Sequence, residues 1–217
     1  MSSPAEQRRE RLTADHAALA ELARASTLFT FEAQGSTPER YTFIFRGRGV
    51  QPDPGGRITT SELHRCDVRL PARYPAAPPD VCFLTPLVHP NIPFGGVVRL
   101  EDLGLPWQPQ IGLEVVCERL WDAVRLAYVD PDHATNDAAK LWYEGQREYL
   151  TPVDPRPLRN GIKEPNRNVI KYHRRSGSPA TLDSNATGDL FYITDDAPCT
   201  APARASAAAE VWYLGDE

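Results

Sequence analysis

The chain has 217 residues with a formal net charge of −5, and its 41% hydrophobic and 24% charged residues are ordinary for a soluble globular protein. Its length allows one medium domain with an extension, or two small domains. The acidic balance argues against non-specific binding to nucleic acid, which requires a basic surface. No run reaches the roughly 20 apolar residues of a membrane-spanning helix, and the polar first residues do not form a secretory signal. We therefore expect a cytoplasmic protein that binds neither nucleic acid nor membranes.

The four cysteines lie far apart and form no Cys-x-x-Cys pair. In a reducing compartment we expect them to be free thiols. The five histidines do not cluster with them at the spacing of zinc ligands, so the sequence predicts no metal site, and nothing in it implies a cofactor.

The first element is predicted to be a helix that ends near residue 25. Ser3-Pro4-Ala5-Glu6 fits a capping box with proline at the first helical position. Apolar residues then recur at three- and four-residue spacing from Leu12 to Ala23. Arg8, Arg9 and Arg11 form a basic patch near the start of this helix, which we expect to bind a partner.

The apolar period changes to two between residues 29 and 85. Residues 29–31 and 41–45 alternate on either side of a turn at residues 35–38, which predicts a hairpin. A Gly/Pro-rich loop at residues 51–57 follows, and then strands over 63–70 and 81–85. Four consecutive strands without an intervening helix indicate an antiparallel meander.

From Gln110 the apolar period returns to 3.6 and predicts a helix with a broad face that packs on the sheet. Pro109 suits the start of this helix and Asp130-Pro131 its end. A further helix is predicted from Thr135, a suitable cap. Its expected apolar face consists of Ala138, Leu141, Trp142, Gly145 and Tyr149.

Beyond Thr151 the composition changes, and prolines at 152, 155 and 157 predict a stiff connector. We expect a domain over residues 1–150 and an extension over 151–217. Residues 189–196 and 210–217 each read acid, aliphatic, aromatic, Tyr, aliphatic, small, acid, acid. Coincidence, paired strands and two copies of a segment that docks on a sheet edge all remain open. Docking would use the aromatic side chains Phe191, Tyr192, Trp212 and Tyr213.

The order of these elements resembles that of the ubiquitin-conjugating enzyme family, and several motifs match in register. Residues 74–85 resemble Tyr-Pro-x-x-Pro-Pro-x-Val-x-Phe-x-Thr, and residues 89–92 resemble the His-Pro-Asn motif. Residues 107–109 resemble Trp-Ser-Pro, and residues 130–132 and 136–139 resemble the acidic Pro-Asp segment and the Asn-x-x-Ala helix start. The resemblance covers roughly residues 5–150. It implies an α+β fold: an N-terminal helix, a four-stranded antiparallel meander and C-terminal helices.

The resemblance places the catalytic cysteine of the family seven positions after Ile92, where this chain has Arg99. Conjugation needs a thiolate, which accepts an acyl group and leaves readily. A guanidinium stays protonated up to a pH of about 12 and has no nucleophilic lone pair. Between Ile92 and Pro109 there is no Cys, Ser, Thr or Lys to replace it. Cys82 and Cys117 are expected to be small buried hydrophobes, and Cys199 lies far away in the sequence.

Other residues of the matching motifs have implied roles. In active members the asparagine that corresponds to Asn91 supports either the oxyanion or the adjacent loop, and its presence without the cysteine favours the loop. His89, which precedes Pro90 in the motif, is expected to form structural hydrogen bonds. Asp130 and Asp132 lie where the family places an acid near the incoming lysine, although a solvated helix end is an equal interpretation.

The resemblance also implies a surface that docks partner ligases, built from two loops. Prolines restrict their own φ and the conformation of the preceding residue, so these loops are held with little residual entropy. Rigid connectors without a partner are the alternative. The residues are Tyr74, Pro75, Pro78 and Pro79 in one loop, and Trp107 and Pro109 in the other.

Three functions follow. The leading hypothesis is a noncatalytic relative of conjugating enzymes in a bacterial ubiquitin-like pathway, with antiphage defence as a possible setting. It would form a hetero-oligomer with an active conjugating enzyme, an activating enzyme or a ubiquitin-like modifier. The second is an active enzyme, either with Arg99 introduced in place of its cysteine or with an unrecognised nucleophile. The third is an interaction domain unrelated to ubiquitin.

Overall fold

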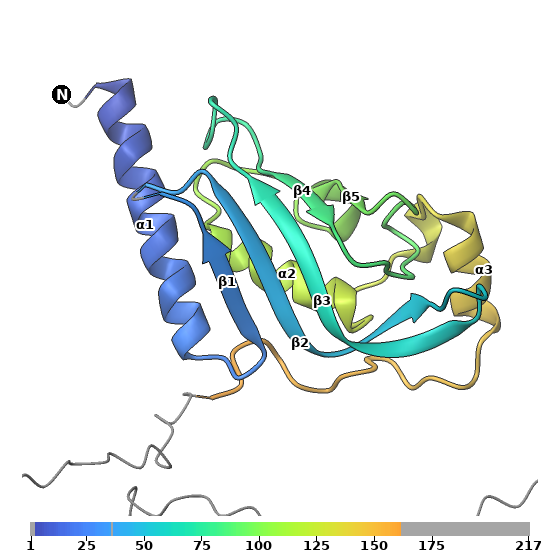
Figure 1. The fold of residues 1–217 in the computed structure, drawn as a ribbon. Coiled ribbons are helices and arrows are strands. Elements are labelled where there is room, and N and C mark those ends of the chain that lie inside the picture. The colour runs from blue at the N-terminus through green and yellow to red at the C-terminus, as the bar shows by residue number, and fades with distance from the viewer. Residues whose placement is uncertain (1–2, 36, 162–217) are drawn as a thin grey trace, which may run out of the picture. The chain divides into compact units, whose positions relative to one another are not determined.

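The computed structural model describes residues 3–35 and 37–161, and they form the expected α+β fold (Figure 1). None of the helices in these residues is long and apolar enough to cross a bilayer. The elements in chain order are α1 (Pro4–Arg24), β1 (Phe29–Ala33), β2 (Arg40–Pro52), β3 (Ile58–Arg69), β4 (Asp80–Phe83), β5 (Val97–Val98), the 3₁₀ turn η1 (Leu100–Leu103), α2 (Leu113–Val124), the 3₁₀ turn η2 (Pro131–His133) and α3 (Asp137–Gly145).

The predicted capping box starts α1. The Ser3 hydroxyl accepts a hydrogen bond from the Glu6 N–H, and the Glu6 carboxylate accepts one from the Ser3 N–H at 2.7 Å. The helix ends at Arg24, as the apolar spacing predicts. Its buried face consists of Leu12, Leu19 and Leu22, together with one residue that the pattern did not indicate, Asp15.

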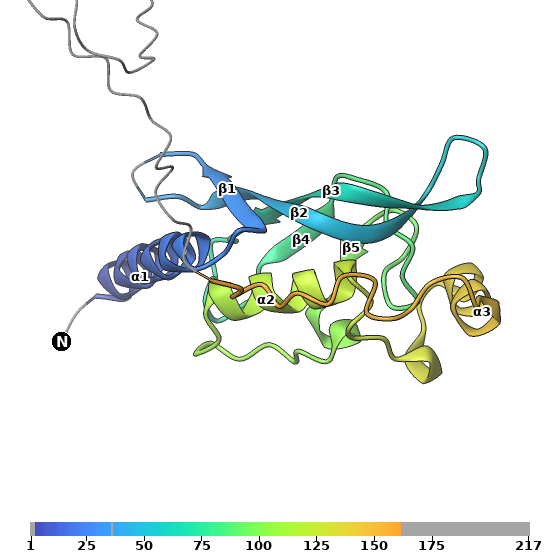
Figure 2. The ribbon, with the colours of Figure 1, turned by 90° about the horizontal axis from the view of Figure 1, so that it is seen from below.

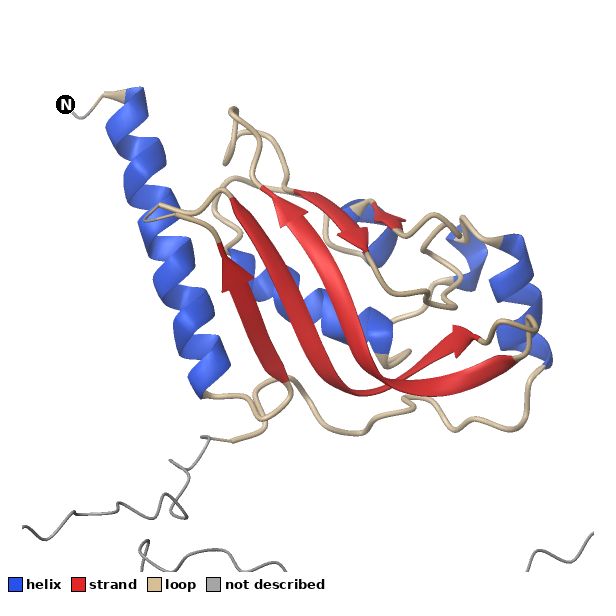
Figure 3. Cartoon of the chain, in the orientation of Figure 1, coloured by secondary structure: helices blue, strands red, loops and turns tan. Residues whose placement is uncertain are grey.

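The sheet is an antiparallel meander in the order β1-β2-β3-β4-β5 (Figure 3). The prediction of four strands was therefore incomplete, because a two-residue strand is too short to show a period of two. The predicted loop at 51–57 was also too long, since β2 continues to Pro52 and β3 begins at Ile58. A bulge between Arg46 and Gly49 bends β2.

One face of the sheet is covered by α2, with α1 and α3 towards its two ends (Figure 2). The helix begins at Leu113 with Gly112 as N-cap, so the predicted start at Pro109 was wrong. It also ends before Asp130-Pro131, because Leu126 adopts a φ of 56°, which an α-helix excludes. The predicted apolar face is confirmed, and all of its members are buried: Leu113, Val116, Cys117, Leu120, Trp121 and Val124.

The start of α3 differs by one residue from the prediction. Asn136, not Thr135, is the N-cap, and its side chain accepts a hydrogen bond from the Ala139 N–H at 3.1 Å. The buried face shifts with it: Ala139 is buried, whereas Leu141 is 70% exposed. Of the predicted face, Trp142 and Tyr149 are half-buried, and Ala138 and Gly145 are exposed.

The first residues of the sequence-predicted extension pack against the domain. Val153, Asp154 and Leu158 are buried, and the Trp121 indole N–H donates to the Arg156 carbonyl at 2.9 Å. The segment therefore runs along α2 (Figure 2). The octapeptides at 189–196 and 210–217, with Phe191, Tyr192, Trp212 and Tyr213, and Cys199 lie outside the described residues.

Candidate functional site

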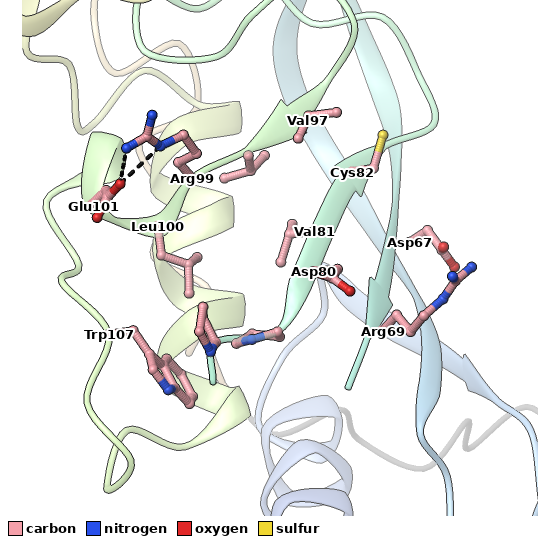
Figure 4. A pocket seen from close by; sticks show the side chains of 13 residues that line it. Asp67, Arg69, Asp80, Val81, Cys82, Val97, Arg99, Leu100, Glu101 and Trp107 are labelled. Atoms are coloured by element: carbon pink, nitrogen blue, oxygen red, sulfur yellow. Dashed lines mark hydrogen bonds and ion pairs between the residues drawn. The ribbon is translucent and has the colours of Figure 1, made fainter. Parts of the chain in front are cut away.

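Arg99 lies immediately after β5, in extended backbone with φ −98° and ψ 119°, and occupies the N-cap position of η1 without a capping hydrogen bond from its side chain. Its side chain is 67% exposed, and its Nε and Nη2 atoms both donate to Glu101 Oε1 (Figure 4). Asp102 Oδ2 lies 3.8 Å from Nε. The hydrogen bond to Glu101, aided by the charge of both carboxylates, raises the pKa of Arg99. The side chain is thus a permanent cation that donates hydrogen bonds and cannot carry an acyl thioester.

The His89 side chain is buried and forms two structural hydrogen bonds. Its Nδ1 accepts from the Asn91 N–H at 3.0 Å, so its Nε2 carries the proton that is donated to the Tyr128 carbonyl at 2.8 Å. Burial lowers the pKa of His89 to about 4, against a weaker opposing effect of the bond to Tyr128. His89 is therefore neutral at pH 7 and holds the motif against the chain after α2.

The Asn91 side chain forms hydrogen bonds with the segment that precedes α3 through both its amide nitrogen and its amide oxygen. Its Nδ2 donates to the carbonyls of Asp130 and His133 at 2.7 and 3.0 Å, and its Oδ1 accepts from the Asp130 N–H at 2.8 Å. Both amide protons are committed, so neither is available to an oxyanion in this conformation. Pro90 adds to the same connection, since its carbonyl accepts from the N–H groups of Thr135 and Asn136.

The two candidate acids occupy different environments. Asp130 caps η2: its carboxylate accepts from the N–H groups of Asp132 and His133 and from the His133 ring at 2.9 Å. These bonds, that from the His133 ring first, lower the pKa of Asp130. Asp132 is exposed. The observed bonding of Asp130 is that of a helix cap, and Asp132 is the acid left open to a ligand.

The structure brings the two candidate docking loops together. The Trp107 indole N–H donates to the Pro75 carbonyl at 2.9 Å, and the rings of Tyr74 and Trp107 lie 5.7 Å apart. Pro78 and Pro109 are exposed, but Tyr74 and Pro79 are buried. The expectation that Tyr74 and Pro79 contact a partner is corrected accordingly: they support the surface from beneath.

Asp15, which the sequence did not single out, anchors both loops. It is 3% exposed and accepts hydrogen bonds from the Tyr74 hydroxyl at 2.6 Å, Arg11 Nε at 2.8 Å and the Leu113 N–H at 3.2 Å. Arg11 also donates to the carbonyls of Pro109 and Ile111. The sequence signal was an acid four residues after an arginine, on the edge of an apolar stripe.

Two of the three arginines in the expected basic patch form bonds within the domain. The Arg11 guanidinium is used internally, and Arg8 pairs with Glu39 at 2.6 Å and donates to the Pro71 carbonyl. Arg9 is exposed. Within the described residues, Arg9 is therefore the member of the patch best placed to meet a partner.

The expectation that Cys82 is buried is also corrected. Cys66 and Cys117 are fully buried, but Cys82 is half-buried on the outer face of β4. It lines a hollow of about 490 Å³ that Arg99, Val97 and Trp107 also border (Figure 4). Residues 3–35 and 37–161 contain no cluster of His, Cys, Asp or Glu side chains that could hold a metal ion.

The chain is similar in sequence to ubiquitin-conjugating enzymes. The sequence model described as ubiquitin-conjugating enzyme matches residues 54–155. Ubiquitin-conjugating enzyme E2 T of Homo sapiens is 40% identical over 29% of this chain and 34% of its own length. Ubiquitin-conjugating enzyme E2 13 of Schizosaccharomyces pombe is 36% identical over 37% and 54%. Protein PEROXIN-4 of Arabidopsis thaliana is 31% identical over 49% and 64%.

The chain thus spans between about a third and just under two thirds of the length of these relatives. Among solved structures, the E2 domain of a Toxoplasma gondii ubiquitin conjugating enzyme superposes with a TM-score of 0.46 at 24% identity, over 64% of this chain and 88% of that chain. The sequence match over residues 54–155, together with a helix, a meander and C-terminal helices in the expected order, gives the described part of this chain the α+β fold of ubiquitin-conjugating enzymes, and its sequence is similar to theirs over that range.

Proposed function

We propose that this protein is a noncatalytic member of the family that presents a partner in a bacterial ubiquitin-like conjugation pathway. The observation that carries the proposal is Arg99, an exposed cation at the register of the acyl-accepting cysteine. The surrounding framework of His89 and Asn91 is fully hydrogen-bonded, so the fold is maintained without the nucleophile. Antiphage defence is a setting that we propose with it.

The proposed partner is an active conjugating enzyme, an activating enzyme or a ubiquitin-like modifier. A presenting subunit works by orientation: it holds an acceptor beside a charged enzyme and makes attack effectively intramolecular, which lowers the barrier by several kcal/mol. The exposed parts of the two joined loops, Pro78 and Pro109 with half-buried Trp107, supply a rigid surface for docking. We further propose that residues 187–217 contribute to binding, so that their deletion weakens partner affinity while the melting transition of the domain is preserved.

The test uses the active conjugating enzyme of the same organism. Adding this chain to that enzyme, its activating enzyme, ATP and the modifier should raise the rate of transfer to an acceptor. A matched variant, Trp107→Ala, should lose much of the increase, whereas Leu141→Ala, on the exposed side of α3, should retain it. An unchanged transfer rate together with no co-purification would contradict the proposal.

A second candidate is an active transferase. One observation favours it: Cys82 is half-exposed on the hollow that Arg99 borders. Incubation with the activating enzyme, ATP and the modifier would then give a hydroxylamine-sensitive adduct that Cys82→Ser abolishes. Arg99→Cys serves as the positive control for docking of the activating enzyme. If the unaltered chain forms such an adduct, the noncatalytic proposal is wrong.

A further inference from the structure

The free edge of the sheet at β5 has unused backbone groups. Val97 lies opposite Cys82, and the next pair is joined by a hydrogen bond from the Phe83 N–H to the Gly96 carbonyl at 2.8 Å. In an antiparallel ladder, hydrogen-bonded and non-hydrogen-bonded pairs alternate. The N–H and C=O of Val97 therefore point away from β4. In the strand order of the described residues, β5 is the last strand on that side.

The edge continues past the end of β5. Arg99 keeps an extended backbone, so its N–H points to the same side as the N–H of Val97 two residues before. The Arg99 carbonyl accepts from the Asp102 N–H at 3.0 Å, where η1 begins. The edge thus offers the N–H and C=O of Val97 and the N–H of Arg99, which are the groups that an added strand would pair with.

Apolar side chains around this edge are exposed. Phe94 is 89% exposed, and Leu84 and Val97 are each 58% exposed. Natural sheets protect such edges with charge, proline or a covering element, and contiguous exposed apolar side chains mark interaction sites. The hollow of about 490 Å³ lies on one side of Val97, and a second hollow of about 230 Å³ is lined by Leu84, Phe94 and Gly96. A segment laid along β5 would bury side chains in both.

Arg99 adds a charge preference. It is two residues from Val97, so the two side chains leave the same face of the edge. Glu101 accepts hydrogen bonds from the Nε and Nη2 atoms, and Asp102 Oδ2 lies 3.8 Å from Nε, so the contacts of Arg99 within residues 3–35 and 37–161 are on the Nε and Nη2 side of the guanidinium. A guanidinium held on this side is oriented to donate hydrogen bonds to a further carboxylate from its Nη1 side.

We propose that β5 binds an extended segment of a partner protein as an added strand, with an apolar residue against Val97 and an acidic residue two positions away against Arg99. The unpaired backbone groups require an extended chain, the exposed apolar side chains require an apolar residue, and Arg99 selects the acid. This interaction goes beyond the presenting function and does not depend on it, because no conjugation reagent takes part.

The probe is the acetylated, amidated peptide Thr-Val-Ser-Glu-Thr-Val-Ser with a fluorescent label, titrated against the full-length protein by anisotropy. Amide exchange followed by NMR should show protection of the Val97 N–H on binding. The same peptide with N-methyl groups on its first serine and its second valine cannot donate to the Val97 carbonyl in either strand direction, and it should bind about tenfold more weakly. Equal affinity of the two peptides would overturn strand addition.

Variants test the side chains. Val97→Lys should abolish measurable binding, and Arg99→Gln should weaken it about threefold, as for an exposed charge pair. The matched control Leu141→Lys introduces the same charge at a distant exposed apolar site and should bind normally. Loss of binding in the control, or none in Val97→Lys, would refute the assignment of the edge.

Two other occupants of the β5 edge can be distinguished from a partner segment by experiments on the same full-length protein. If sedimentation shows a dimer that Val97→Lys dissolves, the edge binds a second copy and the proposal is wrong. If a peptide of residues 189–196 displaces the probe at a lower concentration than the unlabelled probe does, the edge belongs to the chain's own extension, which also overturns it. A monomer that prefers the probe supports it.

Discussion

The loop around Asn91 and the edge that carries Arg99 are close in sequence but use their polar groups in opposite ways. Asn91 is fully buried, and three of its hydrogen bonds hold the chain before α3. Arg99 is exposed and bonds to carboxylates only two and three residues away. The His-Pro-Asn motif therefore holds parts of the fold together, whereas the Arg99 side chain bonds only to its own near neighbours in the sequence.

The largest effect is expected at Asp15, which supports the docking loops. Asp15→Ala would leave the Tyr74 hydroxyl proton and the Leu113 N–H without an acceptor and would remove the carboxylate that pairs with half-buried Arg11, which keeps its bonds to the carbonyls of Pro109 and Ile111. We expect a loss of about 3 kcal/mol in the free energy of unfolding. Urea denaturation measures it, with Glu10→Ala on the exposed side of α1 as the control. A loss below about 1 kcal/mol would show that the network is dispensable.

Asn91 should come next. Asn91→Ala leaves the Asp130 N–H and two carbonyls unsatisfied, at a cost of about 3 kcal/mol. The change should appear in chemical denaturation and as faster amide exchange in residues 130–136. If stability is unchanged, the motif is not structural, and the contrast with Arg99 fails.

The pH dependence of stability tests His89. The folded pKa of His89, about 4, lies below the ordinary histidine value of 6.5, so the unfolded state binds more protons and stability falls as pH drops from 6.5 towards 4. The full loss is about 3 kcal/mol. Burial lowers the pKa of His64 as well, with the same sign. His89→Gln should therefore flatten the profile between pH 6.5 and 4.5 only in part; an identical slope would contradict the assignment.

The smallest effect is expected at Arg99. Its ion pairs are exposed to solvent, and Arg99→Ala should leave the free energy of unfolding unchanged within the error of the measurement. The measurement is the same denaturation experiment that is used for Asn91→Ala. A loss comparable to that of Asn91→Ala would mean that Arg99 is structural and that its residue reports nothing about function.

Much of the fold could be predicted, because amphipathic periods report burial directly. The strands, the apolar face of α2 and the capping box of α1 all follow from side-chain spacing. The two residues of β5 could not be predicted, since they show no period and pair only through tertiary structure. The start of α3 was misplaced by one residue because Thr135 and Asn136 are both suitable caps, and in the structure the Asn136 side chain accepts the hydrogen bond from the Ala139 N–H.

The candidate site was less predictable. The motifs located His89, Asn91 and Trp107, but they did not indicate that the Tyr74 hydroxyl donates to buried Asp15, which is distant in sequence. The burial of Cys82 was mispredicted. In β4 its side chain lies on the outer face of the sheet, whereas those of Val81 and Phe83 are buried. Because the residues from Val81 to Leu84 are all apolar, the sequence does not show which of them face outward. Side-chain direction in a short strand is fixed by its neighbours, and the sequence of the strand alone does not contain it.

The noncatalytic role is tested most directly by the intact mass of the unaltered protein after incubation with an activating enzyme, ATP and the ubiquitin-like modifier of the same organism. We predict an unchanged mass, under conditions in which the organism's own cysteine-bearing conjugating enzyme gains one modifier. A hydroxylamine-sensitive mass increase of one modifier, on Cys82 or on any other side chain, would contradict the account.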